Sequence, residues 1–242
     1  MEKPTLVLLP GMDGTGNMFA PFVAAMGGLC NTLCIRYPDD VAMGYAELEA
    51  LVRSQLPHNT RYVVLGESFS GPIAASLSAA PPPGLIGVVL CCTFLRNPRP
   101  QLAVFGGLLK FAPLKAAPIA AMVPVLLGRY STAALRTALS NALAQVSTVT
   151  LQARLRAVLQ VDVRAHLAAA KIPVLYLRAK QDYLLPARAT AEVQASLPSV
   201  EMQSIAGPHL LLQACPVPAA AAVSRFMRSL ASATFADYPS AP

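Results

Sequence analysis

Short apolar runs alternate with longer amphipathic segments along most of the chain. Several of the apolar runs are continuous instead of alternating with polar positions, which is typical of strands that helices cover on both faces. We predict strands near residues 5–9, 32–37, 62–65, 87–91, 173–178 and 200–205, and helices near residues 18–26, 45–55, 69–79, 187–197 and 218–230. This order predicts the α/β class, with a mostly parallel sheet in one large domain.

Ser68 lies where one of these apolar strands runs into a helical segment. The sequence Gly-Glu-Ser-Phe-Ser-Gly, from residue 66, is close to the nucleophile elbow Gly-x-Ser-x-Gly, with Ser70 in the last position. A serine on so tight a turn has a strained backbone, so the residues two before and two after it must be small, as Gly66 and Ser70 are. The N–H of Phe69 would then point to where an oxyanion forms. The alternative is a plain Gly/Ser-rich turn.

A serine hydroxyl needs a base, and the base needs an acid that orients it. The chain has three histidines. His209 follows the predicted strand 200–205, which is the position of the base when the chain order is serine, acid, histidine. We expect His58, in a polar turn before Ser68, to be solvated, and His166, in a short helix, to be structural.

Asp182 is the acidic residue in the loop after the predicted strand 173–178, and it lies before His209 in the chain. The interval leaves room for one helix and one strand between the two. Asp162 competes for the role, but it precedes that strand and would lie at the wrong edge of a parallel sheet. The other acid position, after the strand near residue 91, holds Thr93 and Phe94 instead of a carboxylate.

The loop after the first strand reads Pro-Gly-Met-Asp-Gly-Thr-Gly from residue 10. A second oxyanion donor is expected in this loop, and the N–H of Met12 is our candidate. Gly11 and Gly14 would let the backbone approach a substrate closely. A phosphate-binding loop is the alternative, but neither Gly-x-Gly-x-x-Gly nor a following Gly-Lys-Ser/Thr is present. A plain turn is the other alternative.

Together these motifs resemble the α/β-hydrolase family over nearly the whole chain. The first loop and the elbow are similar to those of small bacterial esterases and, more distantly, of plant acyltransferases of the phytyl ester synthase type. The resemblance implies Ser68 as nucleophile, His209 as base, Asp182 as orienting acid, and Met12 and Phe69 as backbone donors of the oxyanion hole. Two features depart from the family pattern. The first loop lacks the common His-Gly, and residues 37–41 replace the usual Asp-x-x-Gly-x-Gly-x-Ser turn.

Residues 94–161 interrupt the alternation of strands and helices. In the α/β-hydrolase fold an insertion at this point is commonly a helical cap. We therefore predict a cap over residues 94–161 and a core of residues 1–93 and 162–242. No Asp or Glu occurs between residues 68 and 161, and that stretch holds Arg96, Arg99, Lys110, Lys115, Arg129, Arg136, Arg154 and Arg156.

These eight positive charges exceed the net charge of +7 of the whole chain. The cap could steer an anionic substrate or contact an anionic membrane through the apolar stretch 102–128. It could equally be a solvated basic face without a ligand. We expect no nucleic-acid partner, because the stretch is apolar and shows no known nucleic-acid-binding module. The apolar cap suits the lining of an acyl or aromatic pocket. The sequence does not specify an oligomeric state.

The cysteines, five in number, suggest neither a metal site nor a disulfide framework. Cys30 and Cys34 lack partner ligands at zinc spacing, and the pair Cys91 and Cys92 ends an apolar strand. We predict no metal and no cofactor. Residues 1–9 are too short for a secretory signal, and no 18-residue run lacks both a charge and a proline. The sequence therefore predicts a cytoplasmic protein with reduced cysteines.

The resulting prediction is a serine carboxylic-ester hydrolase that acts on small to medium apolar esters through an acyl-enzyme. An acyltransferase or thioesterase with the same triad is the first alternative. A non-catalytic binding module on this scaffold is the second, since a fold does not fix a function.

Overall fold

A computed structural model describes residues 3–101 and 119–233 of the chain. Its centre is a parallel sheet of six strands in the order β2-β1-β3-β4-β5-β6. The strands are β1 (Thr5–Leu9), β2 (Asn31–Cys34), β3 (Tyr62–Glu67), β4 (Leu85–Cys91), β5 (Val174–Gln181) and β6 (Glu201–Pro208). Each pair of neighbours is parallel, so the predicted fold class is confirmed.

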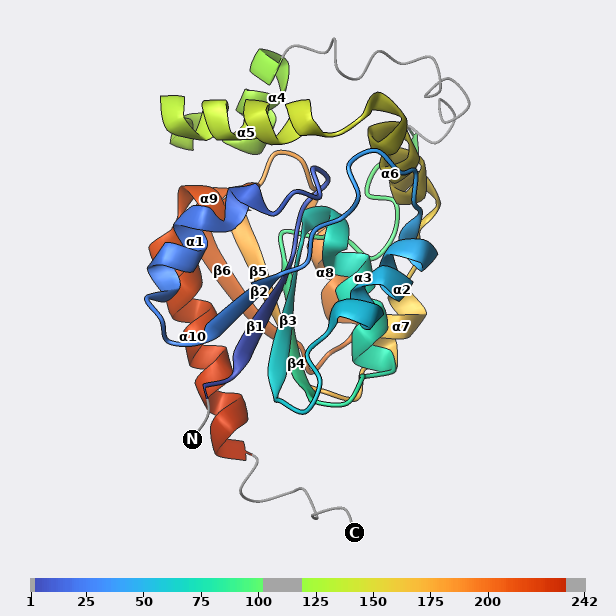
Figure 1. Ribbon diagram of the computed structural model, residues 1–242, viewed down its shortest axis with the longest axis vertical. Helices are drawn as coiled ribbons and strands as arrows, with labels where there is room; N and C mark the ends of the chain where they lie inside the picture. The colour runs from blue at the N-terminus through green and yellow to red at the C-terminus, as the bar shows by residue number, and fades with distance from the viewer. Residues whose placement is uncertain (1–2, 102–118, 234–242) are drawn as a thin grey trace.

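Helices cover both faces of the sheet (Figure 1). On one face lie α1 (Ala20–Met26), α9 (Leu211–Ala214) and α10 (Pro216–Ala233), and on the other lie α2 (Tyr45–Gln55), α3 (Gly71–Ala79), α7 (Arg164–Ala168) and α8 (Ala187–Ser196). Alternate residues of each central strand enter the two cores. Leu6, Leu8 and Leu65 pack in the first core, whereas Val7 and Val64 pack in the second. Burial on both faces explains why these strands are continuous apolar runs.

The strand ends differ from the sequence prediction in ways that matter for the site. β5 and β6 run about three residues further than predicted, so Asp182 and His209 are the first residues after their strands. β2 ends at Cys34, before the predicted end at residue 37, because the chain then turns to the first loop, where the Tyr37 N–H donates to the Gly14 carbonyl at 2.9 Å. Two predicted helices begin with a 3₁₀ turn, at Asn17–Phe19 and Ser68–Ser70.

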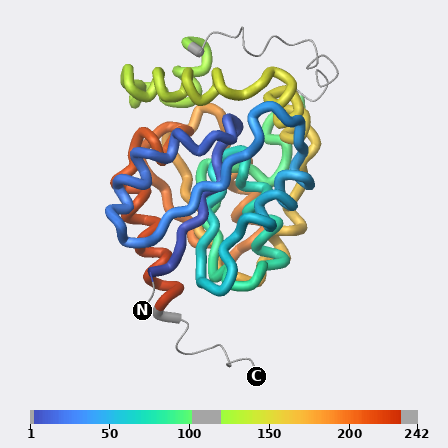
Figure 2. Tube along the Cα trace, viewed as in Figure 1, coloured from blue at the N-terminus to red at the C-terminus, as the bar shows by residue number. Residues whose placement is uncertain are grey.

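The described part of segment 94–161 lies over the carboxyl ends of the strands (Figures 1 and 2). It forms α4 (Ile119–Leu126), α5 (Ala133–Gln145) and α6 (Thr148–Gln160), which we call the cap helices. An apolar cluster of Met18, Leu126, Leu127, Leu139 and Ala142 packs α4 and α5 onto the turn after β1. Residues 102–118 of the predicted cap, with Lys110 and Lys115, lie outside the described residues.

Within residues 3–101 and 119–233, no helix combines the length and the apolar character that crossing a membrane requires.

Candidate active site

Ser68 stands directly after β3 in a conformation that serine rarely adopts. Its φ is 48°, in the left-handed region, where a side chain crowds the backbone. The small neighbour predicted two residues earlier is required. A Cβ at Gly66 would lie 2.7 Å from the carbonyl oxygen of Ser70 and 2.8 Å from the Cβ of Ala74. The tight turn therefore presents the half-buried Ser68 at the carboxyl edge of the sheet, under the cap helices.

The structure brings Ser68, His209 and Asp182 together in one hydrogen-bonded chain. Ser68 Oγ lies 2.9 Å from His209 Nε2, and His209 Nδ1 lies 2.8 Å from Asp182 Oδ2. An ionised carboxylate only accepts hydrogen bonds, so Nδ1 carries the proton and Nε2 is free to accept from the serine hydroxyl. Three strands thus deliver the three groups in the order needed for proton transfer away from Ser68.

Asp182 is held in place by its own loop. Its Oδ1 accepts hydrogen bonds from the N–H groups of Leu184 and Leu185, each at 2.9 Å. Its other oxygen is then left for His209. The His209 side chain is 2% exposed and that of Asp182 is 11% exposed, so their interaction is little weakened by solvent.

The competing residues lie elsewhere. His58 and His166 are exposed, and within the described parts of the chain neither is bonded to Ser68. Asp162 is also exposed and pairs with Arg164 at 2.6 Å. The described residues contain no cluster of three or more His, Cys, Asp or Glu that could hold a metal ion.

The departure of the elbow from the usual motif has a structural cause. The position that follows Ser70 must be glycine, because a Cβ at Gly71 would lie 1.9 Å from Oγ1 of Thr93. Thr93 Oγ1 donates a hydrogen bond to the carbonyl of Ser68 at 2.5 Å. Thr93 therefore supports Ser68 from the position after β4 that was the other candidate position for an acid.

The serine in place of the usual glycine, Ser70, also makes specific contacts. It is fully buried. Its hydroxyl donates to the carbonyl of Pro10 and lies 2.6 Å from the hydroxyl of Tyr37. Ser70 thus ties the elbow to the loop after β1.

In that loop, five consecutive carbonyl groups, those of residues 10–14, each have a hydrogen-bond donor. Ser70 Oγ donates to the carbonyl of Pro10. The Gly14 N–H donates to the carbonyl of Gly11 at 3.0 Å. The Tyr37 N–H donates to the carbonyl of Gly14 at 2.9 Å. Arg154 Nη1 donates to both Met12, at 2.8 Å, and Asp13, at 2.9 Å. Because all five of these carbonyl groups are bonded, the loop is held in one conformation, and the direction of the Met12 N–H is fixed as well.

Arg154, from cap helix α6, is the largest fully buried side chain of the described residues and is 1% exposed. Its Nη2 donates to the carbonyl of Pro38 at 2.8 Å, and its guanidinium lies 5.7 Å from the ring centre of Tyr37. Burial lowers the pKa of Arg154, which Asp13, Tyr37 and Asp39 oppose. One of the charges expected on a basic cap surface is therefore used inside the molecule.

Other basic residues of segment 94–161 are also engaged. Arg96 pairs with Glu192 at 2.5 Å, and Arg99 donates to the carbonyl of Leu184 at 3.0 Å. Arg129 contacts the ring of Tyr130. The described part of the cap thus offers less free positive charge to a ligand than the sequence suggests.

Glu67, directly before Ser68, is a buried carboxyl group with 3% exposure. Burial raises the pKa of Glu67 to about 8, with Gln213 lowering and Asp13 raising it to a smaller extent. Gln213 Nε2 donates to the two carboxyl oxygens at 2.9 Å and 3.2 Å. At neutral pH this group is mostly uncharged, so the environment of Ser68 gains no further negative charge.

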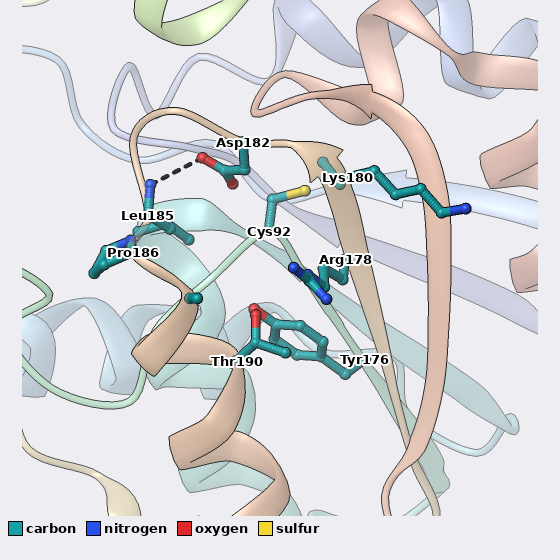
Figure 3. Close-up of a pocket in the computed structure, with 10 residues that line it drawn as sticks. Cys92, Tyr176, Arg178, Lys180, Asp182, Leu185, Pro186 and Thr190 are labelled. Carbon is teal, nitrogen blue, oxygen red and sulfur yellow. Dashed lines mark hydrogen bonds between the residues drawn. The ribbon is translucent and has the colours of Figure 1, made fainter.

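A small pocket of about 110 Å³ lies against Asp182, and Figure 3 shows residues that line it. Tyr176, Arg178 and Thr190 give the pocket polar walls, and the bond from the Leu185 N–H to Asp182 crosses its upper edge in the view. Its volume equals that of only about three or four waters. This pocket is therefore too small and too polar to hold a medium-length acyl chain.

Sequence reasoning missed the residues that support the first loop and the elbow: Tyr37, Glu67, Ser70, Thr93, Arg154 and Gln213. One signal was available. The serine in the last position of the elbow motif marks a place where a hydroxyl was used instead of the usual glycine. Arg154 carried no signal, because in the sequence it is one of many basic residues in an apolar segment.

The sequence matches no protein-family model and no curated relative. Solved structures with a similar fold include an enol-lactonase from Burkholderia xenovorans, with 16% identity, a TM-score of 0.77 and coverage of 96% of this chain and 92% of that one. An α/β-hydrolase enzyme from a deep-sea metagenome has 21% identity, a TM-score of 0.75 and coverage of 94% and 90%. A structure from a study of carboxylesterases of Nitrososphaera gargenis has 13% identity, a TM-score of 0.78 and coverage of 95% and 92%. At such identities these likenesses establish the fold.

Proposed function

We propose that this chain, which has the α/β-hydrolase fold, is a serine carboxylic-ester hydrolase with Ser68, His209 and Asp182 as its catalytic triad. The observation that carries the proposal is the hydrogen-bonded chain from Ser68 Oγ through His209 to Asp182. It begins at a serine in a strained conformation on a strand-to-helix turn, where a nucleophile is exposed to substrate. The similar folds of an enol-lactonase and of carboxylesterases support an ester as substrate.

The reaction begins when Ser68 Oγ attacks the ester carbonyl and His209 Nε2 takes the hydroxyl proton. Asp182 stabilises the imidazolium that forms and holds His209 in the required tautomer. His209 then protonates the leaving alcohol, and an acyl group remains on Ser68. In the second half, His209 activates a water that attacks the acyl-enzyme, which releases the acid and restores Ser68.

The N–H groups of Met12 and Phe69 would stabilise the oxyanion in both halves. Phe69 begins the turn into α3, and its position is fixed because Tyr45 stacks on its ring, with centroids 4.9 Å apart, and donates to its carbonyl at 2.9 Å. Met12 lies in the loop whose carbonyls are all bonded. Both donors are thus rigid, which is what stabilisation of a developing charge requires.

We propose that the acyl group binds beside Ser68, on the side that faces the cap helices. The cluster that joins α4 and α5 to the core consists of apolar residues such as Leu126, Leu127 and Met18, and the half-buried Met12 packs at the edge of the core. An apolar acyl group of short to medium length suits this surface. Cytoplasmic location and contact with an anionic membrane stay predictions of the sequence.

The test is an assay of wild type and Ser68→Ala on p-nitrophenyl esters of rising acyl length. We expect wild type to show a burst of p-nitrophenol, and Ser68→Ala to lose about 10⁶ in kcat, as removal of a triad nucleophile does. The acyl length at the maximum rate measures the pocket. Full activity in Ser68→Ala would refute the proposal. A folded wild type without activity on any ester would favour a thioester or another specialised substrate.

Acyl transfer is the second candidate, favoured by the near-complete burial of His209 under the apolar cap helices. If water has poor access, an alcohol can take its place in the second half of the reaction. Adding alcohol acceptors and measuring the ratio of transfer to hydrolysis separates the two outcomes. A ratio well above the molar ratio of alcohol to water would identify a transferase.

A further inference from the structure

Arg154, from cap helix α6, holds the loop after β1 that carries the proposed oxyanion donor Met12. The turn at residues 11–14 is closed by the Gly14 N–H bonded to the Gly11 carbonyl at 3.0 Å. The Gly11 carbonyl and the Met12 N–H belong to one planar trans peptide and point in opposite directions. Whatever holds this turn therefore also aims the Met12 N–H.

Arg154 holds the turn at the two peptide groups that follow. Its Nη1 donates to the carbonyls of Met12 and Asp13, at 2.8 Å and 2.9 Å. The guanidinium fills the place beside Gly14, since a Cβ there would lie 2.6 Å from Nη1, and the φ of Gly14 is 69°. Glycine thus gives the loop both its left-handed bend and the room for Arg154.

The same guanidinium connects the loop to the segment after β2. Its Nη2 donates to the carbonyl of Pro38 at 2.8 Å, and its face lies over the ring of Tyr37. The hydroxyl of Tyr37 lies 2.6 Å from that of Ser70, which in turn donates to the carbonyl of Pro10. The loop is therefore held at one end by the elbow and at the other end by the cap.

A guanidinium suits this position for a physical reason. It is planar, presents donors in a fixed fork and remains charged when buried. Three carbonyl acceptors on two segments match that fork. Lysine has a compact charge and lacks the planar fork, so it could not bond the same carbonyls with the same geometry.

We infer that Arg154 is a positioning residue of the oxyanion hole, so that the hole is complete only when cap helix α6 is seated on the core. This inference rests on the proposed function. Arg154 does not touch the substrate. It acts through the Met12 peptide, and its loss should weaken binding of the transition state more than binding of the ester.

The experiment compares Arg154→Met and Arg154→Lys with Arg156→Met, a control on the same helix that makes none of the Arg154 contacts. Each is assayed on the best p-nitrophenyl ester and titrated with a trifluoromethyl ketone of equal acyl length, which forms an oxyanion on Ser68. We expect Arg154→Met to lower kcat by about 10²-fold, as misplacing one donor does, with KM nearly unchanged. Affinity for the ketone should fall by a similar factor. Arg154→Lys should show an intermediate loss, and Arg156→Met none.

A purely structural role would give a different result. It would lower the melting temperature and the amount of active enzyme, measured by titration of Ser68, without changing kcat per active site or affinity for the ketone. That result in Arg154→Met overturns the inference. If Arg154→Met fails to fold, the inference is tested with Arg154→Lys instead, because this variant keeps the positive charge at the buried position. A folded Arg154→Lys with wild-type kcat and wild-type affinity for the ketone then overturns it.

The two proposals fail separately. If wild type is inactive on esters and Ser68 cannot be acylated, the proposed function fails. If wild type is active, Ser68→Ala is inactive and both Arg154 variants match wild type per active site, the inference about Arg154 alone fails.

Discussion

Ser68, Asp182 and His209 are each the first residue after a strand of one sheet, whereas the first loop is held by side chains from distant segments. The donor to the Pro10 carbonyl is 60 residues away in the chain, and the donor to the Met12 carbonyl is 142 residues away. Parallel strands bring their carboxyl ends to one edge, so the sheet alone brings these three residues together. The loop reaches its conformation only when the elbow, the segment after β2 and α6 are all in place. The arrangement of the proposed triad thus follows from the topology of the sheet, and the conformation of the proposed oxyanion loop follows from side-chain packing.

The strongest test of the first half of this comparison is Asp182→Asn. We expect kcat to fall by about 10⁴, because an amide nitrogen facing His209 favours the wrong tautomer. The loop should stay folded, since the amide oxygen can still accept from the N–H groups of Leu184 and Leu185. The measurement is kcat on the best ester, together with the free energy of unfolding.

Asp162→Asn is the matched control, because Asp162 is exposed and pairs with Arg164. It should leave kcat unchanged. A near-wild-type rate in Asp182→Asn would mean that another group orients His209, and the triad would then not be the product of strand order that we describe.

The contrast between the two regions also decides what the sequence could predict. Strand, acid, helix, strand and histidine follow one another in the chain, so the order of elements pointed to Asp182 and His209. The structure places His209 against Ser68 and Asp182 against His209. The predicted strands and helices nearly all recur with small shifts at their ends. One of those shifts has a long-range cause, because the N–H of Tyr37, beyond the end of β2, donates to the carbonyl of Gly14.

The support of the first loop could not be predicted in the same way. Whether an arginine in a cap is solvated or buried depends on the carbonyl groups that surround it after folding. Arg154 and Arg156 are two residues apart and chemically identical, yet the first is buried and the second half-buried. Ser70 could be noticed, because it stands where the elbow motif usually has glycine. Its partners, Pro10 and Tyr37, could not be predicted, because they come from other segments of the chain.

Glu67 lies between Ser68 and the loop after β1, and its burial predicts a pH dependence of stability. It precedes Ser68, and its carboxyl lies 3.9 Å from where a Cβ of Gly11 would be. Burial raises the pKa of Glu67 to about 8 from an ordinary value of 4.5. Between these values the unfolded chain releases a proton that the folded protein retains, so the stability contributed by this group is present at pH 4 and is lost as the pH rises to 8.

We therefore expect the free energy of unfolding of wild type to fall from pH 4.5 to pH 8, by at most about 1.4 kcal/mol per pH unit from this group. Glu67→Gln should flatten this fall, because an amide at this position cannot ionise. Chemical denaturation across the range measures it, with Glu201→Gln, at an exposed position, as control. Equal slopes for wild type and Glu67→Gln would mean that Glu67 is ionised in the folded protein, and the region between elbow and loop would then be charged.

The smallest expected effect comes from Ser70→Ala, which removes the bond between the elbow and the loop. Ser78→Ala is a matched control, because Ser78 lies on α3, is equally buried, and donates only to the carbonyl of Ala75, one turn earlier, at 2.7 Å. Each variant loses one buried hydroxyl and about 1–3 kcal/mol of stability.

Only Ser70→Ala removes the hydrogen bond that holds the Pro10 end of the first loop. We expect it to lower kcat by about tenfold, equivalent to about 1.4 kcal/mol of transition-state stabilisation, while Ser78→Ala retains wild-type kcat. If both variants lost stability and neither lost kcat, the loop would keep its conformation without the elbow, and Arg154 would be left as the side chain that fixes it.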